Sequence, residues 1–252
     1  MTANASLDFG YPWWLSYGHL VILIPAVAAL AAGLRFRWPR WLVVLLGVTT
    51  IWSVAAMGAL NYVGINSRGA LPTANFFRAG EGKVLDIGAG TGRSSIMLLE
   101  ARPKATLIAL DQFGESFEHH FGHGPTPQER LQANLNAAGV ANRASITTSD
   151  MRKLPFDDAS FDAIISAYAV DHLPREGVKQ ALAEAHRVLK PGSEFLLMLV
   201  HNDRWIKFAF GPALSHGGTR NKLWWNERLK EAGFQIAEEG TAPATLYFLL
   251  RR

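Results

Sequence analysis

The sequence predicts an α/β protein with a mostly parallel, doubly wound sheet of seven strands, preceded by a hairpin of two apolar helices. From residue 81 onward, short apolar segments alternate with segments of helical periodicity, which is typical of parallel sheets. Two uncharged runs before residue 70 are long enough to cross a membrane. We therefore divide the 252 residues into a membrane helical hairpin over 1–66, a linker and short lead-in helix over 67–80, and a globular domain over 81–252.

Each element of the globular domain has a local signal. Apolar runs mark the strands, of which the last two form a closing hairpin: 83–88, 106–111, 144–150, 161–168, 194–200, 234–240 and 245–251. Helical spacing covers about 94–101, 126–136, 175–189 and 221–232. Ser94 is the expected N-cap of the first of these helices. The sequence Thr126-Pro127-Gln128-Glu129 is a capping box that opens the second.

The two apolar runs cover about residues 13–34 and 41–63 and contain no charged side chain. Each supplies the ~20 residues that a helix needs to cross a ~30 Å hydrocarbon layer. Aromatic side chains, which favour the headgroup region, lie near the ends of both runs: Trp13, Trp14, Trp38, Trp41 and Tyr62. No basic segment precedes the first run, which disfavours a signal peptide. The alternative is a buried helical hairpin of a soluble protein.

The composition excludes several kinds of chemistry. The chain contains no cysteine, which rules out disulfides, thiolate nucleophiles, Cys-ligated zinc and iron–sulfur clusters. The net charge is +4, and most of it lies in residues 1–70, which contain four arginines and one aspartate. The globular domain is therefore nearly neutral, and we expect no nucleic-acid partner.

A glycine-rich loop joins the first predicted strand to the first predicted helix in the sequence VLDIGAGTGRS. Gly88, Gly90 and Gly92 permit a tight turn and close approach of a ligand to the backbone. The start of the helix offers free N–H donors to an anionic group. The dinucleotide fingerprint GxGxxG would require glycine at position 93 or 95, where this chain has Arg93 and Ser95. The loop therefore disfavours a nicotinamide cofactor.

Further segments agree with one protein family. Asp111 ends the second strand in IALD, SDMRKLPFDDASFDAIIS leads into the fourth strand, and AYAVDHLP and HRVLKPGSEFLLML follow. Together with the glycine loop, these segments resemble the class I S-adenosylmethionine-dependent methyltransferases over roughly residues 76–252. The resemblance implies a Rossmann-like fold, S-adenosylmethionine as the cofactor and methyl transfer as the activity. It does not specify the acceptor.

The resemblance also implies roles for individual residues. The cofactor would be bound by Asp86, Gly88, Ala89, Gly90, Gly92, Asp111, Gln112, Asp150 and Met151. In this scheme Asp111 accepts from the ribose hydroxyls, while Asp150 and Met151 contact the adenine. A structural role stays open for each aspartate.

The candidate catalytic residues follow the fourth strand, where ligands of such sheets bind. His172 is the candidate base, with Asp171 and Tyr168 beside it. A base is needed only if the acceptor carries a proton with too high a pKa. A role for His172 as a wall of the pocket therefore stays open.

Two segments depart from the family's pattern. After Asp111, an insertion carries His119, His120 and His123, which fit a surface loop, part of an acceptor pocket or a metal site; we predict no metal. Residues 201–218 follow the fifth strand and are apolar, so they form a lid, an interfacial element or core.

We expect a membrane-associated methyltransferase that acts on a small lipophilic or lipid-like acceptor, because the hairpin would hold the pocket at the bilayer surface. The alternatives are methylation of a membrane protein partner, a nicotinamide-dependent oxidoreductase and a non-catalytic membrane scaffold. The sequence indicates no oligomeric state.

The membrane topology contains a conflict. A cytosolic cofactor requires a domain that faces the cytoplasm. The positive-inside rule would place the loop RFRWPR in the cytoplasm as well, but a hairpin that crosses the membrane twice puts its loop and the following domain on opposite sides. The conflict is resolved if the loop is translocated despite its charge, if the helices dip into one leaflet, or if they pack over the domain. In each case we expect the catalytic domain to face the cytoplasm.

Overall fold

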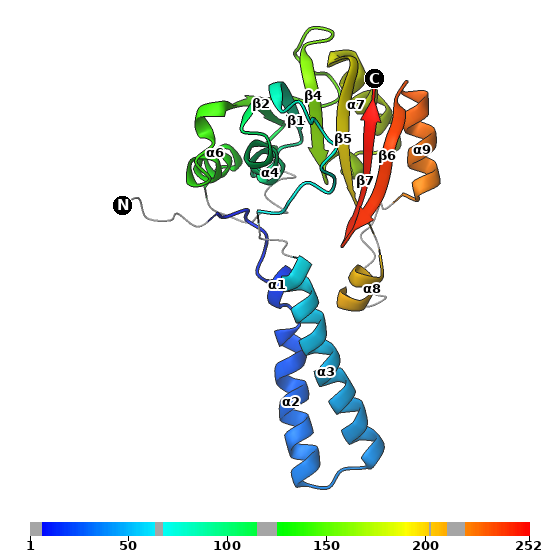
Figure 1. The fold of residues 1–252 in the computed structure, drawn as a ribbon. Helices are drawn as coiled ribbons and strands as arrows, with labels where there is room; N and C mark the ends of the chain where they lie inside the picture. The colour runs from blue at the N-terminus through cyan, green and yellow to red at the C-terminus, as the bar shows by residue number, and fades with distance from the viewer. Residues whose placement is uncertain (1–6, 64–67, 115–124, 202, 211–219) are drawn as a thin grey trace.

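The computed structural model describes residues 7–63, 68–114, 125–201, 203–210 and 220–252, and it shows a helical hairpin that projects from an α/β domain (Figure 1). The hairpin consists of α2 (Leu20–Arg35) and α3 (Arg40–Val63), with the short helix α1 (Trp14–Tyr17) at its base. The two predicted helices are confirmed, although a turn at 18–19 separates α1 from α2. Because the hairpin points away from the domain, the interpretation in which its helices pack over the domain is wrong.

The hairpin exposes most of its large apolar side chains. Ile51 is 71% exposed and Val21 is 68% exposed. Segments Trp14–Arg35 and Arg40–Tyr62 have the length and composition of membrane-crossing helices, and only 17% of each apolar window is buried. A core helix of a soluble protein would be mostly buried, so these helices are candidate membrane spans by length, composition and exposure.

The α/β domain contains a seven-stranded sheet in the order β3-β2-β1-β4-β5-β7-β6. Its strands are β1 (Glu81–Ile87), β2 (Lys104–Asp111), β3 (Ala144–Thr148), β4 (Phe161–Ala167), β5 (Leu189–Val200), β6 (Gln235–Ala242) and β7 (Thr245–Arg251). The first five pair in parallel, and β7 pairs antiparallel with β5 and β6. The predicted sheet with its closing hairpin is therefore confirmed. The strand order reverses between β1 and β4, and ligands of open parallel sheets bind at such a point.

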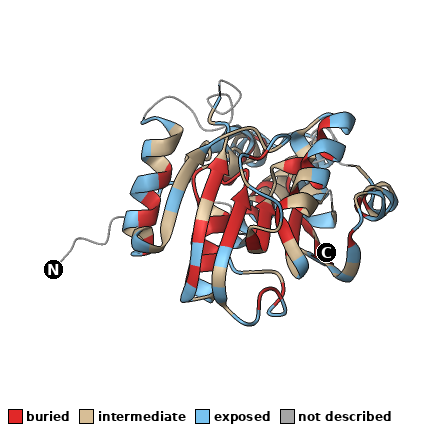
Figure 2. Cartoon of the chain, turned by 90° about the horizontal axis from the view of Figure 1, so that it is seen from above, coloured by how far each residue is buried: buried red, intermediate tan, exposed pale blue. Residues whose placement is uncertain are grey.

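The faces of the sheet are covered by α4 (Arg93–Ala101), α6 (Pro127–Ala137), α7 (Arg175–Val188) and α9 (Lys222–Glu231), with the 3-10 turns η1 (Ala141–Arg143) and η2 (Val170–His172). The short helix α8 (Arg204–Phe210) lies instead beside the base of the hairpin, against α3 (Figure 1). Neighbouring strand residues alternate between two cores. Val84 packs on the face with Leu98 and Leu107, whereas Leu85 packs on the face with Phe195 and Trp225. Figure 2 shows the buried residues gathered in the strands and on the helix faces beside them. This burial of both faces explains why the central strands are continuously apolar.

Two local predictions require correction. Ser94 does not cap α4: the N-cap is Gly92, and the Ser94 hydroxyl donates instead to Asp86. The lead-in helix predicted within 67–80 is wrong, because residues 74–79 form turns. The Arg102 guanidinium accounts for the turns by donating to the carbonyls at 74, 76 and 77, which a helix would have used for its own N–H groups. The capping box at Thr126 is confirmed.

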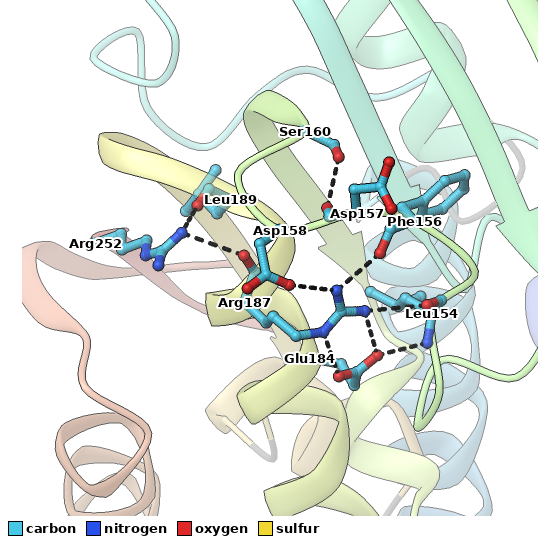
Figure 3. A network of polar contacts seen from close by, with 9 residues as sticks. All are labelled: Leu154, Phe156, Asp157, Asp158, Ser160, Glu184, Arg187, Leu189 and Arg252. Carbon is cyan, nitrogen blue, oxygen red and sulfur yellow. Dashed lines mark hydrogen bonds and ion pairs between the residues drawn. The ribbon is translucent and has the colours of Figure 1, made fainter.

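A polar network fixes the loop between β3 and β4 against α7 (Figure 3). Arg187 donates to the carbonyl oxygens of Leu154 at 3.1 Å and Phe156 at 2.8 Å, and it pairs with Glu184 at 2.8 Å. Glu184 in turn accepts from the backbone N–H of Leu154 at 2.7 Å. The Arg187 hydrogen bond lowers the pKa of Glu184 below its ordinary value. Because this loop begins at Asp150, the network helps to position a predicted cofactor contact.

Candidate active site

A cavity of about 1180 Å³ lies at the carboxyl ends of the parallel strands, beside the base of the hairpin. The glycine loop after β1 and the ends of β2 and β4 contribute its polar lining. The turn at 242–245, which joins β6 to β7, lines it as well. Trp14, Leu15 and Tyr62 from the hairpin, with Ile206 and Phe210 from α8, add apolar lining. One cavity therefore joins the glycine loop to the candidate membrane helices.

The glycine loop leaves backbone open to the cavity. Gly88, Gly90 and Gly92 all have positive φ, at 75°, 53° and 91°, and Gly88 and Gly90 line the cavity whereas the predicted cofactor contact Gly92 does not. A Cβ atom on Gly88 would lie 2.2 Å from the Cβ of Ala169, and one on Gly92 would lie 2.4 Å from Leu131 Cδ1. Side chains at these positions are therefore excluded by both conformation and space. The result is a backbone cradle that fits a flat, extended ligand such as a nucleoside.

Asp111 holds its carboxylate at the cavity by accepting from two backbone N–H groups. Its Oδ2 accepts from Gly90 at 2.9 Å, and its Oδ1 accepts from Phe113 at 3.0 Å. Each carboxylate oxygen can accept a further hydrogen bond. Gln112 and Ala89, both predicted cofactor contacts, also line the cavity. The fixed carboxylate fits two neighbouring hydroxyl groups such as those of a ribose.

Asp150 and Met151 line the same cavity. The Arg152 side chain donates to both oxygens of Asp150, with a closest approach of 2.5 Å. These hydrogen bonds lower the pKa of Asp150, so its carboxylate is charged at neutral pH. The methyl carbon of Met151 would lie 3.2 Å from a Cβ on Gly88, which places this side chain directly over the glycine loop.

Asp86 lies outside the cavity lining and is fully buried behind the glycine loop. Its Oδ2 accepts from the hydroxyls of Ser94 at 2.7 Å and Ser95 at 2.6 Å. Burial raises the pKa of Asp86 to about 6, and the two serine hydrogen bonds offset only part of that effect. Asp86 therefore ties the first turn of α4 to β1 and shapes the loop from behind.

The three predicted catalytic residues occupy different environments. His172 is exposed and lines the cavity from η2. Tyr168 also lines it, with a hydroxyl that shares a hydrogen bond of 2.6 Å with Thr245. Asp171 does not line the cavity, and its Oδ2 accepts from the backbone N–H of Val200 at 2.9 Å. Asp171 thus fastens η2 to the end of β5, while His172 and Tyr168 face the cavity.

Sequence reasoning missed lining residues on both sides of the hairpin. Tyr11 and Pro12 line the cavity from before α1, and Gly69, Ala70 and Pro72 line it from after α3. Burial raises the pKa of Tyr11, and its hydrogen bond with Arg93 lowers it in part. The sequence DFGYP carries no motif, so only its position beside an apolar run could have drawn attention to it.

The irregular segments are described only in part. His119, His120 and His123 lie outside the described residues. Within the predicted segment 201–218, residues 204–210 form α8. Ile206 and Phe210 of this helix line the cavity, and its Ala209 is buried.

Comparisons with known proteins identify the domain. A family model described as "Methyltransferase domain" matches residues 84–192. Residues 84–192 are a methyltransferase domain. The chain is 31% identical over 173 residues to the ubiquinone/menaquinone biosynthesis C-methyltransferase UbiE of Bartonella tribocorum, covering 68% of this chain and 57% of that protein. It is 26% identical over 113 residues to the sterol 4-C-methyltransferase strm-1 of Caenorhabditis elegans, covering 45% and 29%.

A solved structure shares the fold of the methyltransferase domain. It is the 1,6-didemethyltoxoflavin-N1-methyltransferase of Burkholderia thailandensis with bound S-adenosylhomocysteine, at a TM-score of 0.50 and 20% identity, covering 68% of this chain and 71% of that one. The chain spans about half the length of the curated relatives it matches. At this identity the solved structure shows the fold alone, and the family match describes residues 84–192 as a methyltransferase domain. That match opposes the nicotinamide alternative.

Proposed function

We propose that this chain is a membrane-attached enzyme that moves the methyl group of S-adenosylmethionine to a small lipophilic acceptor. The observation that carries the proposal is the single cavity shared by the glycine loop, the hairpin base and α8. Its volume of about 1180 Å³ exceeds the roughly 300–1,000 Å³ of a typical ligand pocket, which leaves room for an acceptor beside the cofactor. Two relatives are named for C-methylation of quinone precursors or sterols, which supports a lipophilic acceptor.

The cofactor would be held by residues that already form a cradle. The glycine loop would contact it through backbone, Asp111 would accept from the ribose hydroxyls, and Asp150 with Met151 would contact the adenine. When bound, S-adenosylmethionine supplies an activated methyl group. Positioning and exclusion of water can then provide much of the catalysis.

His172 is the proposed base for acceptors that must lose a proton. It is exposed and lines the cavity, where an acceptor would bind beside the cofactor. The hydroxyl of Tyr168 is shared with Thr245, so we assign Tyr168 a role in positioning η2 and shaping the wall. Asp171 positions η2 through Val200 and does not reach the acceptor.

The acceptor class can be tested with the full chain in lipid nanodiscs. Transfer of labelled methyl groups is compared for phenols that share one head group and carry either a long apolar tail or none. We expect the tailed acceptor to react at least tenfold faster. Ile206→Trp, which fills the apolar side of the cavity, should remove most of that advantage while binding of S-adenosylhomocysteine persists. Leu223→Trp, at an exposed position on α9, is the matched control.

The same experiment separates the alternatives. Equal rates for tailed and tailless acceptors, unaffected by Ile206→Trp, would refute the lipophilic acceptor. Label that appears in a protein fraction from native membranes, and in no small molecule, would favour methylation of a membrane protein partner. Binding of S-adenosylhomocysteine without any transfer would favour a scaffold.

We also propose that the methyltransferase domain faces the cytoplasm, where S-adenosylmethionine is made. The absence of cysteine from the chain allows a direct test with single introduced cysteines. Arg37→Cys reports on the tip of the hairpin, and Glu227→Cys reports on α9 of the domain. In intact cells, a membrane-impermeant maleimide should leave Glu227→Cys unlabelled. Labelling of Glu227→Cys before lysis would place the domain outside.

A further inference from the structure

The chain enters and leaves the hairpin at the cavity. The pre-hairpin segment, residues 7–12, lines the cavity through Tyr11 and Pro12. The post-hairpin segment, residues 68–72, lines it through Gly69, Ala70 and Pro72. The hairpin is therefore inserted between two stretches of backbone that form one wall of the site.

The pre-hairpin segment is built into the methyltransferase domain. Phe9 is 1% exposed and belongs to the core that contains α4 and α6. Asn134 and Asp8 exchange two hydrogen bonds of 2.8 and 2.9 Å through the Asn134 side chain. Thr91, in the glycine loop, donates to the carbonyl oxygen of Phe9 at 3.1 Å. Side chains from the glycine loop and α6 therefore hold this segment in place.

Arg93 lies where the two segments meet the glycine loop. It is the first residue of α4, and among the described residues that line the cavity it is the only arginine or lysine. A Cβ on Gly69 would lie 3.3 Å from Arg93 Nη2, so the post-hairpin segment packs against the guanidinium. The Tyr11 hydroxyl shares a hydrogen bond with Arg93 from the other segment.

The charge pattern of the cavity indicates what this cation binds. Asp111 and Asp150 are carboxylates and suit the ribose and adenine, which are neutral donors of hydrogen bonds. The methionine part of S-adenosylmethionine ends in a carboxylate, which needs a cation when it leaves water. We propose that Arg93, supported by Tyr11, binds this carboxylate, and that the pre-hairpin and post-hairpin segments close this end of the cofactor site. The proposal rests on the placement of the cofactor under the proposed function.

One consequence concerns the hairpin itself. Because Tyr11 precedes α1 and Gly69 follows α3, the hairpin connects two parts of the cofactor wall and is more than a detachable anchor. Removal of residues 1–66 would delete Phe9 and Tyr11 together with the helices. We therefore expect that truncation to weaken cofactor binding as well as to release the domain from membranes.

The test uses a pair of ligands that differ in one part. S-adenosylhomocysteine carries the amino-acid carboxylate, whereas 5′-methylthioadenosine has the same adenosine without it. Binding of both to the full chain in mild detergent is measured by calorimetry. For Arg93→Met we expect the affinity for S-adenosylhomocysteine to fall about tenfold to a hundredfold, the usual effect of losing a charged hydrogen bond. The affinity for methylthioadenosine should change less than about threefold, which also shows that the variant is folded.

Two further variants sharpen the result. Arg93→Lys keeps the charge and should recover part of the lost affinity. Lys104→Met removes a positive charge at the start of β2, the end of the strand opposite the cavity, from a side chain that is 76% exposed and paired with Glu81, and it should leave both affinities unchanged. Equal losses for the two ligands, or no loss for either, in Arg93→Met would overturn the carboxylate assignment. If the unaltered protein binds neither ligand, the proposed function fails instead.

Discussion

The close approach of the glycine loop to the segment after β4 makes Gly88→Ala a quantitative test of the site. The substitution forces alanine to adopt a φ of 75°, which costs about 1–2 kcal/mol. It also places a methyl group 2.2 Å from the Cβ of Ala169, and overpacking of this kind costs about 1–3 kcal/mol. We therefore expect the free energy of unfolding to fall by about 2–5 kcal/mol. Urea unfolding in mild detergent, followed by near-ultraviolet circular dichroism, would measure it.

Gly139→Ala separates the two contributions. Gly139 has a similar φ of 71°, but no atom lies within 4 Å of its added Cβ, so it should lose only about 1–2 kcal/mol. Gly88→Ala should also weaken binding of S-adenosylhomocysteine, because Gly88 and Ala169 both line the cavity. Ala169→Gly removes the facing methyl group and should restore part of both losses. If Gly88→Ala costs no more than Gly139→Ala, or Ala169→Gly gives no rescue, the two segments do not meet as described.

Three other substitutions test separate parts of the site. The pKa of Asp86 is raised from 3.8 to about 6, so the folded state holds this proton more tightly than the unfolded state does. As the pH rises through this window, the free energy of unfolding of the wild type should fall by up to about 3 kcal/mol relative to that of Asp86→Asn. Urea unfolding at several pH values measures this difference, and a constant difference between the two proteins would show that the shift is absent. Asp111→Asn removes the charge from the proposed ribose contact, and we expect it to weaken the binding of S-adenosylhomocysteine about tenfold to a hundredfold, as measured by calorimetry. An affinity equal to that of the wild type would refute the ribose assignment. Arg187→Met frees the loop after Asp150, and we expect a loss of about 1–3 kcal/mol in stability with weaker cofactor binding; a stability loss without any change in affinity would show that the network does not position that loop.

The sheet could be predicted from the sequence because its signals are local. The central strands β1 and β4 are buried over most of their length and are therefore largely apolar, and the capping box at Thr126 satisfies the first N–H groups of its helix within four residues. The lead-in helix failed because its carbonyls are taken by Arg102, which lies more than 20 residues away. Ser94 failed as a cap because a buried carboxylate competes for its hydroxyl. Both errors arise from side chains outside the local helix signal, with Asp86 eight residues before Ser94 and Arg102 more than 20 residues after the turns.

The candidate site likewise combines residues that local sequence identifies with residues that only the fold brings together. The glycine loop, Asp111 and Asp150 lie in separate segments that resemble one family, and the structure brings them to one cavity. Its place beside His172 made Asp171 a candidate catalytic residue, but Asp171 accepts from the backbone of Val200, which only the pairing of β4 with β5 brings near. Tyr11 was missed because its contacts, through Arg93 and the core around Phe9, cross more than 80 residues.

The connections at the hairpin base bear on how the bilayer and the cavity meet. Trp52 donates to the carbonyl oxygen of Phe208 at 2.9 Å, and the rings of Tyr62 and Trp205 lie 6.4 Å apart, so α8 is fixed to α3 beside the cavity. Trp205 and Phe208 remain exposed. At about 1.5 Å per residue, the 24 residues of α3 extend about 36 Å, more than the ~30 Å hydrocarbon layer. Trp52 lies 12 residues after Arg40, so only about 18 Å of α3 extends beyond its contact with α8. An upright hairpin that crosses the whole layer would therefore place this part of α8 inside the hydrocarbon, whereas a hairpin that enters only one leaflet would leave it outside.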